Sequence, residues 1–207
     1  FTKIEDSVYK ERIKWIDKHF KFVDASKIYT YKSLLDLAKH VKKAWDYQGF
    51  IIDPWNSLAK DKGKLKGTSS YEYNYEALSD VRIFCKDNEI STYICAHAAT
   101  EALRQKHPKG HYYEGHPIPP SAASIEFGGM FVNRCDNFFT VHRYLYSPSD
   151  WMYSHIHVKK CKDIDTGGKC TPLEDPIRLE SIKNNVGFTI ESKNPIQYPD
   201  KNKNTLL

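Results

Sequence analysis

Apolar residues follow a helical spacing in two segments near the start of the chain. Between residues 6 and 20 they fall on one helical face, and we expect Asp6 to cap this helix. Residues 20–23 are mostly apolar and predict a short strand. Thr30 precedes a second helical pattern, which we expect to end at Gly49.

Two short segments that follow are each predicted to form a buried strand. They cover Gly49–Asp53 and Ile90–Cys95. Between them, Ser69 and Glu72 have the spacing of a capping box, which predicts a helix that extends to about Lys86. Because helix and strand alternate along the chain, we expect these two strands to lie side by side in a parallel sheet.

The second half of the chain has a different pattern. Residues 97–124 are rich in His, Pro and Gly and predict a long loop, and three strands are then expected at 138–144, 153–160 and 186–190. The fold class is therefore α/β, with a mainly parallel sheet, flanking helices and a strand-rich C-terminal extension. We expect one domain over 1–194 and a polar tail over 195–207.

Composition narrows the class of protein only slightly. The formal net charge is +5, from 31 Lys and Arg against 26 Asp and Glu, which permits an acidic partner without requiring one. No apolar run is long enough to span a membrane, so no membrane partner is expected. The odd count of five Cys, with Cys85 in a helix and Cys95 in a strand, predicts buried, reduced thiols and a cytoplasmic location. Since the first residue is Phe1, we expect a piece of a longer chain.

Asp53 is the first candidate site residue. An apolar strand that ends in a carboxylate and breaks at Pro54 is the pattern of a Walker B acid, which holds the magnesium shell of a nucleoside triphosphate. His97 follows the next strand, so we expect it at the same edge of the sheet. The alternatives are a strand that simply ends in a turn at Asp53, and a hydrogen-bonded histidine without a catalytic role at His97.

These pieces and the ones that follow them occur in a recognisable order. They are the segment Ile52–Asn56, the helix with Leu78 and Arg82, the strand before His97, the segment Gly128–Asn137, the strand before Arg143, and the run Lys159–Lys162 with its Gly-rich turn. In this order the chain resembles the C-terminal part of the RecA-like motor of hexameric replicative DNA helicases, nearest the Twinkle and phage primase-helicase type. The resemblance extends from about Trp15 to Gly168.

The resemblance implies an ATP-dependent DNA helicase that translocates on single-stranded DNA as a homo-oligomeric ring, a hexamer, with ATP as substrate and Mg²⁺ as cofactor. Asp53 would hold the magnesium shell indirectly and His97 would sense the γ-phosphate. Further residues would contact single-stranded DNA (Arg104, Lys106 and Lys109) or complete the neighbouring subunit's ATP site (Arg143, Lys160 and Lys162). Tyr112 and Tyr113, in the same loop as the first set, could stack on bases.

The chain also departs from this family. It contains no Gly-x-x-x-x-Gly-Lys-[Ser/Thr] motif, and the nearest run, Thr166–Thr171, lacks its spacing. The family's catalytic Glu lies upstream of the matched region, and Lys162 stands where an arginine finger is usual. We therefore expect no ATP hydrolysis by this chain alone. Two alternatives stay open: a catalytically inert RecA-like module that binds nucleic acid or a partner, and another RecA-type ATPase of recombination or repair.

Two further sets of residues have simpler interpretations. The lysines at 60–66 are typical of a solvated loop, with nucleic-acid contact as the alternative. The spacing of His107, His111 and His116 matches no structural zinc site, and we interpret His155 and His157 as lying on opposite faces of a strand. The sequence therefore predicts no zinc site.

Overall fold

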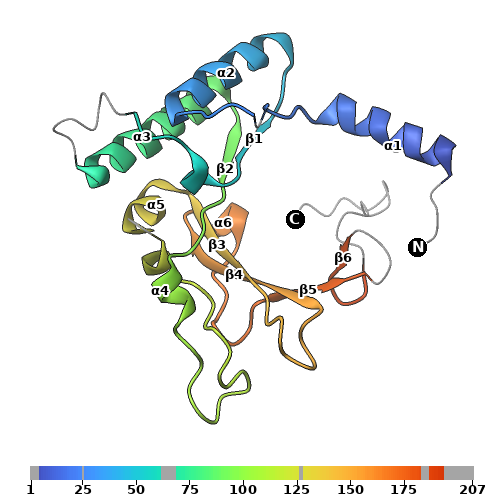
Figure 1. The fold of residues 1–207 in the computed structure, drawn as a ribbon, viewed down its shortest axis with the longest axis vertical. Coiled ribbons are helices and arrows are strands. Elements are labelled where there is room, and N and C mark those ends of the chain that lie inside the picture. The colour runs from blue at the N-terminus through green and yellow to red at the C-terminus, as the bar shows by residue number, and fades with distance from the viewer. Residues whose placement is uncertain (1–4, 25, 62–68, 126–127, 183–186, 194–207) are drawn as a thin grey trace.

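Two sheets, one parallel and one antiparallel, organise the chain in the computed structural model (Figure 1). The structure describes residues 5–24, 26–61, 69–125, 128–182 and 187–193. The expected polar tail and the lysines at 62, 64 and 66 lie outside the described residues.

The parallel sheet has two strands, β1 (Gly49–Ile52) and β2 (Ser91–Ile94), with Ile51 opposite Tyr93. Two helices, α2 (Tyr31–Ala44) and α3 (Ser70–Asn88), pack together with this sheet and supply most of the buried core (Figure 1). The capping box of Ser69 and Glu72 forms at the start of α3, as predicted. Thr30 caps α2, because its side chain accepts a hydrogen bond from the Ser33 amide. The aromatic side chains of the core are Tyr31, Tyr47, Trp55, Tyr73, Phe84 and Phe131.

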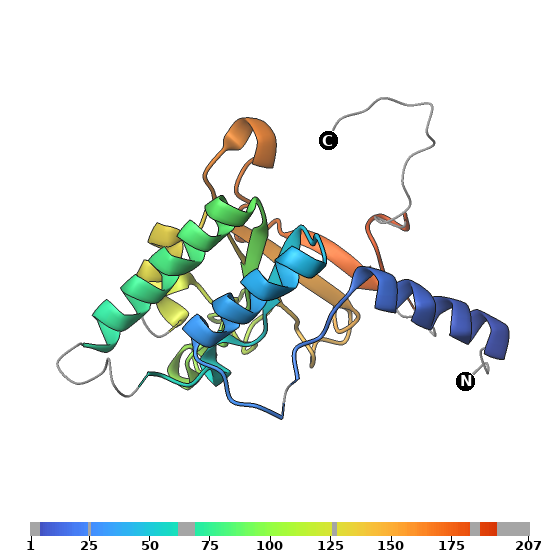
Figure 2. The same ribbon diagram turned by 90° about the horizontal axis from the view of Figure 1, so that it is seen from above.

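The N-terminal helix α1 (Asp6–His19) forms as predicted, but it stands away from the rest of the described chain (Figure 2). None of its residues is buried, because no other described element packs on its apolar face. Asp6 is not the cap: the N-cap is Glu5, whose side chain makes no capping bond. Residues 20–23 form no strand, since they have no neighbouring strand to pair with.

Two other boundaries differ from the prediction. The second helix ends at Ala44 rather than Gly49, and Gly49 is the first residue of β1. Cys95 is exposed just after β2, and Cys85 is only partly buried, so the prediction of buried thiols is wrong. All five cysteines are free thiols.

The second sheet is antiparallel, with the order β3-β4-β5-β6. Its strands are Asn137–His142, Tyr153–Cys161, Ile177–Ser181 and Phe188–Thr189. The prediction of a mainly parallel sheet is therefore wrong for the described residues, in which only β1 and β2 are parallel. Strand β5 was not predicted, and the strand expected at 186–190 is reduced to β6, with residues 183–186 outside the described part.

Short helical elements interrupt the segments expected to be loops. They are η1 (Trp55–Ser57), α4 (Thr100–Leu103), η2 (Ala122–Ser124), α5 (Gly128–Arg134) and α6 (Ile164–Gly167). Helix α5 packs so closely on η2 that a Cβ at Gly128 would lie 1.6 Å from the carbonyl oxygen of Ala122, so only glycine fits there. Among the described helices, none has the length and apolar character needed to cross a membrane.

Candidate functional site

The carboxyl ends of β1 and β2 bring Asp53 and His97 to one edge of the parallel sheet, as predicted. The parallel ladder continues one step past the strands, because the Cys95 amide donates to the Ile52 carbonyl at 2.9 Å and the Trp55 amide donates to the Cys95 carbonyl at 2.8 Å. Asp53 and His97 lie in the two segments that this step joins, and both are exposed. The edge is thus fixed by backbone bonds while both side chains stay accessible to a ligand.

Asn56 joins the two segments. Its side-chain oxygen accepts a hydrogen bond from the His97 amide at 2.9 Å, across 41 positions of sequence. The bond places the start of the long loop after β2 against the turn after Asp53. This side-chain bond adds to the two backbone bonds that join the segments.

The pKa of the Cys95 thiol is raised, and Asp53 is one of the two causes. Burial raises the pKa of Cys95 first, and the negative charge of Asp53 raises it further. The Asp53 carboxylate thus lies close to the end of β2, where a Walker B acid would face a nucleotide.

Magnesium fits this edge only in part. Asp53 supplies one exposed carboxylate, which suits an indirect contact through the cation's water shell. Within the described residues, no group of three or more His, Cys, Asp or Glu side chains could hold a metal ion by itself. The other ligands would have to be phosphate oxygens and a P-loop hydroxyl, which this sequence lacks.

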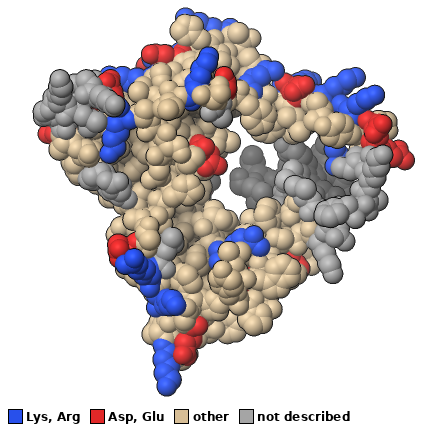
Figure 3. Space-filling model, in the orientation of Figure 1, with Lys and Arg blue, Asp and Glu red and all other residues tan. Residues whose placement is uncertain are grey.

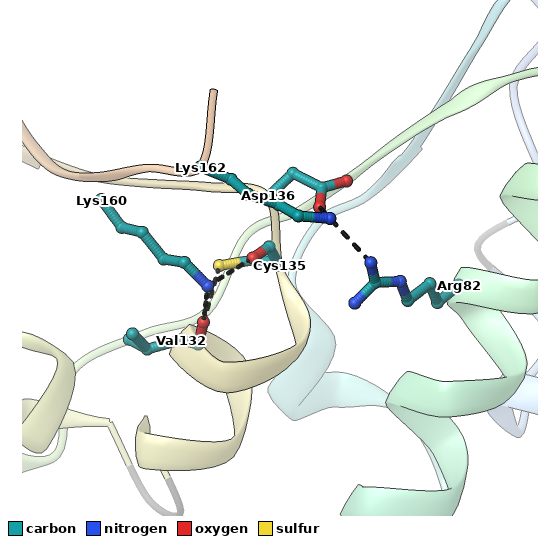
Figure 4. Close-up of polar contacts among 6 residues, drawn as sticks. All are labelled: Arg82, Val132, Cys135, Asp136, Lys160 and Lys162. Carbon is teal, nitrogen blue, oxygen red and sulfur yellow. Dashed lines mark hydrogen bonds and ion pairs between the residues drawn. The ribbon is translucent and has the colours of Figure 1, made fainter. Parts of the chain in front are cut away.

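Lys160 and Lys162 both contact the junction between α5 and β3 (Figure 4). The Lys160 ammonium donates to the carbonyls of Val132 at 2.5 Å and Cys135 at 2.8 Å, where it closes the C-terminal end of α5. The Lys162 ammonium lies 3.1 Å from the carboxylate of Asp136, which is also 3.7 Å from the Arg82 guanidinium. Lys160 is partly buried and used within the chain, whereas Lys162 is exposed and free to exchange partners.

Arg143 does not join them. It follows β3 at the end where His142 pairs with His155, whereas Lys162 follows β4 at the end where Asn137 pairs with Cys161. The two ends are separated by the length of the strands, about 20 Å. The Arg143 guanidinium donates to the Trp151 carbonyl at 2.9 Å. The three residues expected at one subunit boundary thus occupy two places in the described chain.

The loop after His97 has more internal structure than predicted. The His107 amide donates to the His116 carbonyl at 2.9 Å, and the Ile118 amide donates to the Gln105 carbonyl at 2.9 Å, so residues 105–118 close into a compact turn. The candidate DNA-binding cations are all exposed on it or beside it. Arg104 pairs with Glu101 at 3.2 Å, and Lys106 and Lys109 have exposed ammonium groups. On the face in Figure 3, Lys and Arg atoms are scattered among Asp and Glu rather than gathered.

Histidines form a buried layer under this turn, which the sequence prediction missed. His155 and His157 are 2% and 1% exposed, and their ring centroids are 6.4 Å apart. The expectation that they lie on opposite faces is wrong, because residues two apart in a strand share a face. His142 pairs with His155 across β3 and β4. The sequence contained a signal for this layer, because the His-x-His spacing in a strand places both rings on the same face.

Burial favours the neutral form of the histidines in this layer. Burial is the main cause that lowers the pKa of His142 and of His157 to about 4, and it also lowers the pKa of His107 and His155. Four ring nitrogens of His142, His155 and His157 have no hydrogen-bond partner. Protonating any of these rings would place a charge among the others.

Comparisons with known proteins address the fold. No model of a protein family matches the chain, and no curated protein sequence matches it. Solved structures do match, among them a DnaB-like replicative helicase whose structure was described together with its interactions with primase. The TM-score is 0.57 at 11% sequence identity, over 75% of this chain. The chain spans 33% of that helicase chain. At this identity the match concerns the fold alone, and the described chain has a helicase-like fold.

Proposed function

We propose that this chain is part of an ATP-dependent, ring-forming DNA helicase of the RecA-like type, which moves along single-stranded DNA. One observation carries the proposal: the parallel pair β1–β2 presents Asp53 and His97 at one carboxyl edge, within a helicase-like fold. Open α/β sheets bind their ligands at this edge. Because the chain spans a third of the matched helicase, the activity belongs to the protein that combines this chain with a P-loop.

In this proposal each side chain has a role that its position allows. Asp53 accepts hydrogen bonds from the water shell of the nucleotide-bound cation. A bound Mg²⁺ would supply charge neutralisation during phosphoryl transfer, and Asp53 is the residue of this chain that would hold its water shell. His97 contacts the γ-phosphate, and the hydrogen bond from its backbone amide to the Asn56 side chain links it to the turn after Asp53. Because His97 begins the long loop, a change at the phosphate is passed to that loop.

Lys162 has the trans role. It is the exposed cation at the end of β4, and its ion pair with Asp136 is a surface contact of small net strength. A phosphate of the neighbouring subunit's nucleotide can therefore replace Asp136 at low cost. Lys160 has no such freedom, because its ammonium is bonded to two carbonyl groups of α5. Its role is to support the segment from which Asp136 projects.

The proposal is tested by coupling between DNA and hydrolysis in the protein that combines this chain with a P-loop. The wild-type protein should hydrolyse ATP faster with single-stranded DNA present and should displace a strand from a forked duplex. His97→Ala should keep ATP binding but lose the DNA stimulation. Lys42→Ala, a cation of α2 that bonds to Asp46 and the Tyr47 carbonyl, is the control. An unstimulated wild type that displaces no strand would overturn the proposal.

The inert RecA-like module remains the second candidate because the sequence of this chain lacks a P-loop. It predicts nucleic-acid or partner binding without turnover. The same experiment separates the two candidates, since the module would bind DNA but show no hydrolysis that depends on Asp53.

A further inference from the structure

We propose that three exposed aromatic side chains, Tyr112, Tyr146 and Trp151, form an aromatic rim that stacks on the bases of single-stranded nucleic acid. This inference rests on the proposed function and adds a base-contacting surface to it. The three residues come from two segments, the turn 105–118 and the loop between β3 and β4. Tyr112 and Tyr113 contact each other edge to face with ring centroids 4.8 Å apart, but only Tyr112 is exposed, whereas Tyr113 is partly buried.

The rim is exposed to an unusual degree for aromatic residues. Tyr146 is 87% exposed, Tyr112 74% and Trp151 53%. Tyr146 is a central residue of a tight turn, because the Ser147 amide donates to the Tyr144 carbonyl at 2.9 Å. Each exposed ring keeps apolar surface in water that stacking on a base would remove.

The two segments are joined to each other. The Tyr112 hydroxyl lies 2.9 Å from the Ser149 hydroxyl, three positions from Tyr146 and two from Trp151. Tyr113 stacks on Tyr144 with ring centroids 3.6 Å apart, so it is used inside the molecule and is unavailable to a base. Tyr112 therefore lies beside the loop that carries Tyr146 and Trp151.

The support beneath the rim is fixed. The Tyr144 hydroxyl is 3.0 Å from the buried His107 ring, and Asp150, 3% exposed, pairs with Arg178 of β5 at 2.5 Å. Rings that project from a rigid base lose little conformational entropy on stacking, because they have only two side-chain torsions to fix. The Tyr144–His107 and Asp150–Arg178 contacts therefore hold the loop from which the exposed rings project.

The charge around the rim favours a polyanion. Residues 104–117 carry Arg104, Lys106 and Lys109 against Glu114, and residues 143–152 carry Arg143 against Asp150. The sum is four positive and two negative charges. Arg104 is paired with Glu101 and Asp150 with Arg178, and Glu174 lies 3.1 Å from the His111 ring of the turn. Lys106, Lys109 and Arg143 are therefore the cations left for phosphate groups. Cations for the phosphates and rings for the bases are the combination used by proteins that bind single strands without sequence preference. A protein partner would not need the surplus of positive charge.

Binding of a fluorescent oligothymidine to the full chain tests the proposal. Tyr146→Ala and Tyr112→Ala should each weaken binding by about tenfold, since a stacked base contributes roughly 1–3 kcal/mol. Tyr146→Phe should restore binding because it keeps the aromatic ring. The slope of affinity against salt should stay unchanged in these variants, because no phosphate contact is lost. Lys106→Gln with Lys109→Gln should lower that slope instead. Tyr9→Ala, an exposed tyrosine of α1, is the matched control.

An abasic strand of the same length gives an independent readout. The wild type should bind it more weakly than Tyr146→Ala binds oligothymidine, because an abasic strand offers no base to any of the three rings. Equal binding of both strands by the wild type, or unchanged binding by Tyr146→Ala, would overturn the aromatic rim and leave the proposed function intact. If the wild type binds no strand at any salt concentration, the nucleic-acid role in the proposed function fails with it.

Discussion

Lys160 and Lys162 lie two positions apart but make different kinds of contact. Lys160 is partly buried and bonded to two carbonyl groups at the end of a helix, where a cation also interacts favourably with the helix dipole. Lys162 pairs with one carboxylate in water. The first is a structural contact and the second is one that a ligand can replace.

Lys160→Met should therefore destabilise the fold, whereas Lys162→Met should not. We expect a loss of about 1–3 kcal/mol in the free energy of unfolding for Lys160→Met, because two partly buried carbonyls lose a charged donor. For Lys162→Met we expect a change within about 0.5 kcal/mol, as for other exposed pairs. Urea unfolding measures both. Equal losses in the two variants would contradict the distinction.

At this scale the sequence located Asp53 and His97 correctly, because strand ends can be derived from apolar runs and the two strands pair in parallel. It could not supply Asn56 or Asp136 as partners. Their contacts cross 41 and 26 positions of sequence, and such pairing depends on how elements pack. The histidine layer was missed because His155 and His157 were predicted on opposite faces of the strand, whereas residues two apart share a face.

Local chemistry determines the helices of the first half. The reciprocal bonds between Ser69 and Glu72 satisfy two free amides at the start of α3. Ser69→Ala removes the side-chain acceptor of the Glu72 amide and should cost about 1 kcal/mol of unfolding free energy. Ser79→Ala, within the same helix and exposed, should cost almost nothing. Thermal unfolding of the two variants compares them, and an equal shift in Tm would show that the cap is not used.

The elements that were predicted share strong local signals, and the others lack them. Helices α2 and α3 have capping boxes at their starts, β1 is apolar throughout, and β2 follows with β-branched and aromatic residues, Thr92, Tyr93 and Ile94. Strand β5 alternates polar and apolar residues over a short span, and α5 begins with two glycines, which disfavour helices. Residues 20–23 had a strand composition but no partner strand, so tertiary context decided the outcome.

At the scale of the whole molecule, the neutral histidine layer makes stability depend on pH. The pKa of His142 and of His157 falls from 6.5 in the unfolded chain to about 4 in the folded one. As pH decreases, the unfolded chain therefore takes up protons first, and stability is full above about pH 6.5 and lost progressively toward pH 4. Each histidine contributes up to about 1.4 kcal/mol per pH unit in this window.

Urea unfolding between pH 7 and pH 5 measures the effect. His157→Gln should reduce the dependence on pH, and His40→Gln, an exposed histidine of α2, should leave it as in the wild type. The two variants are compared by the change in unfolding free energy over this range rather than by its absolute value. A wild type whose stability is constant from pH 7 to pH 5 would contradict a neutral, buried layer.

The parallel sheet leaves one apolar face bare. Ile51 and Tyr93, which pair across β1 and β2, are 61% and 52% exposed, and α1 exposes a further apolar face. Around its central hollow, the face in Figure 3 is mostly uncharged. Since exposed apolar patches and free strand edges promote association, the chain should self-associate at micromolar concentration.

Sedimentation velocity tests this. Ile51→Lys with Tyr93→Lys should shift the chain toward monomer, and Ile164→Lys, an equally exposed residue of α6, should not. A wild type that stays monomeric as its concentration rises would show that the bare face does not drive association.

The measurement that tests the central claim most directly is steady-state ATP hydrolysis by Asp53→Asn in the protein that combines this chain with a P-loop. Asp87→Asn, an exposed carboxylate of α3, is the control. We predict that Asp53→Asn lowers turnover by roughly a hundredfold or more while nucleotide binding is largely kept, because the amide no longer holds the cation's water shell with a negative charge. Turnover equal to that of Asp87→Asn would contradict the assignment of Asp53 and of the edge on which it lies.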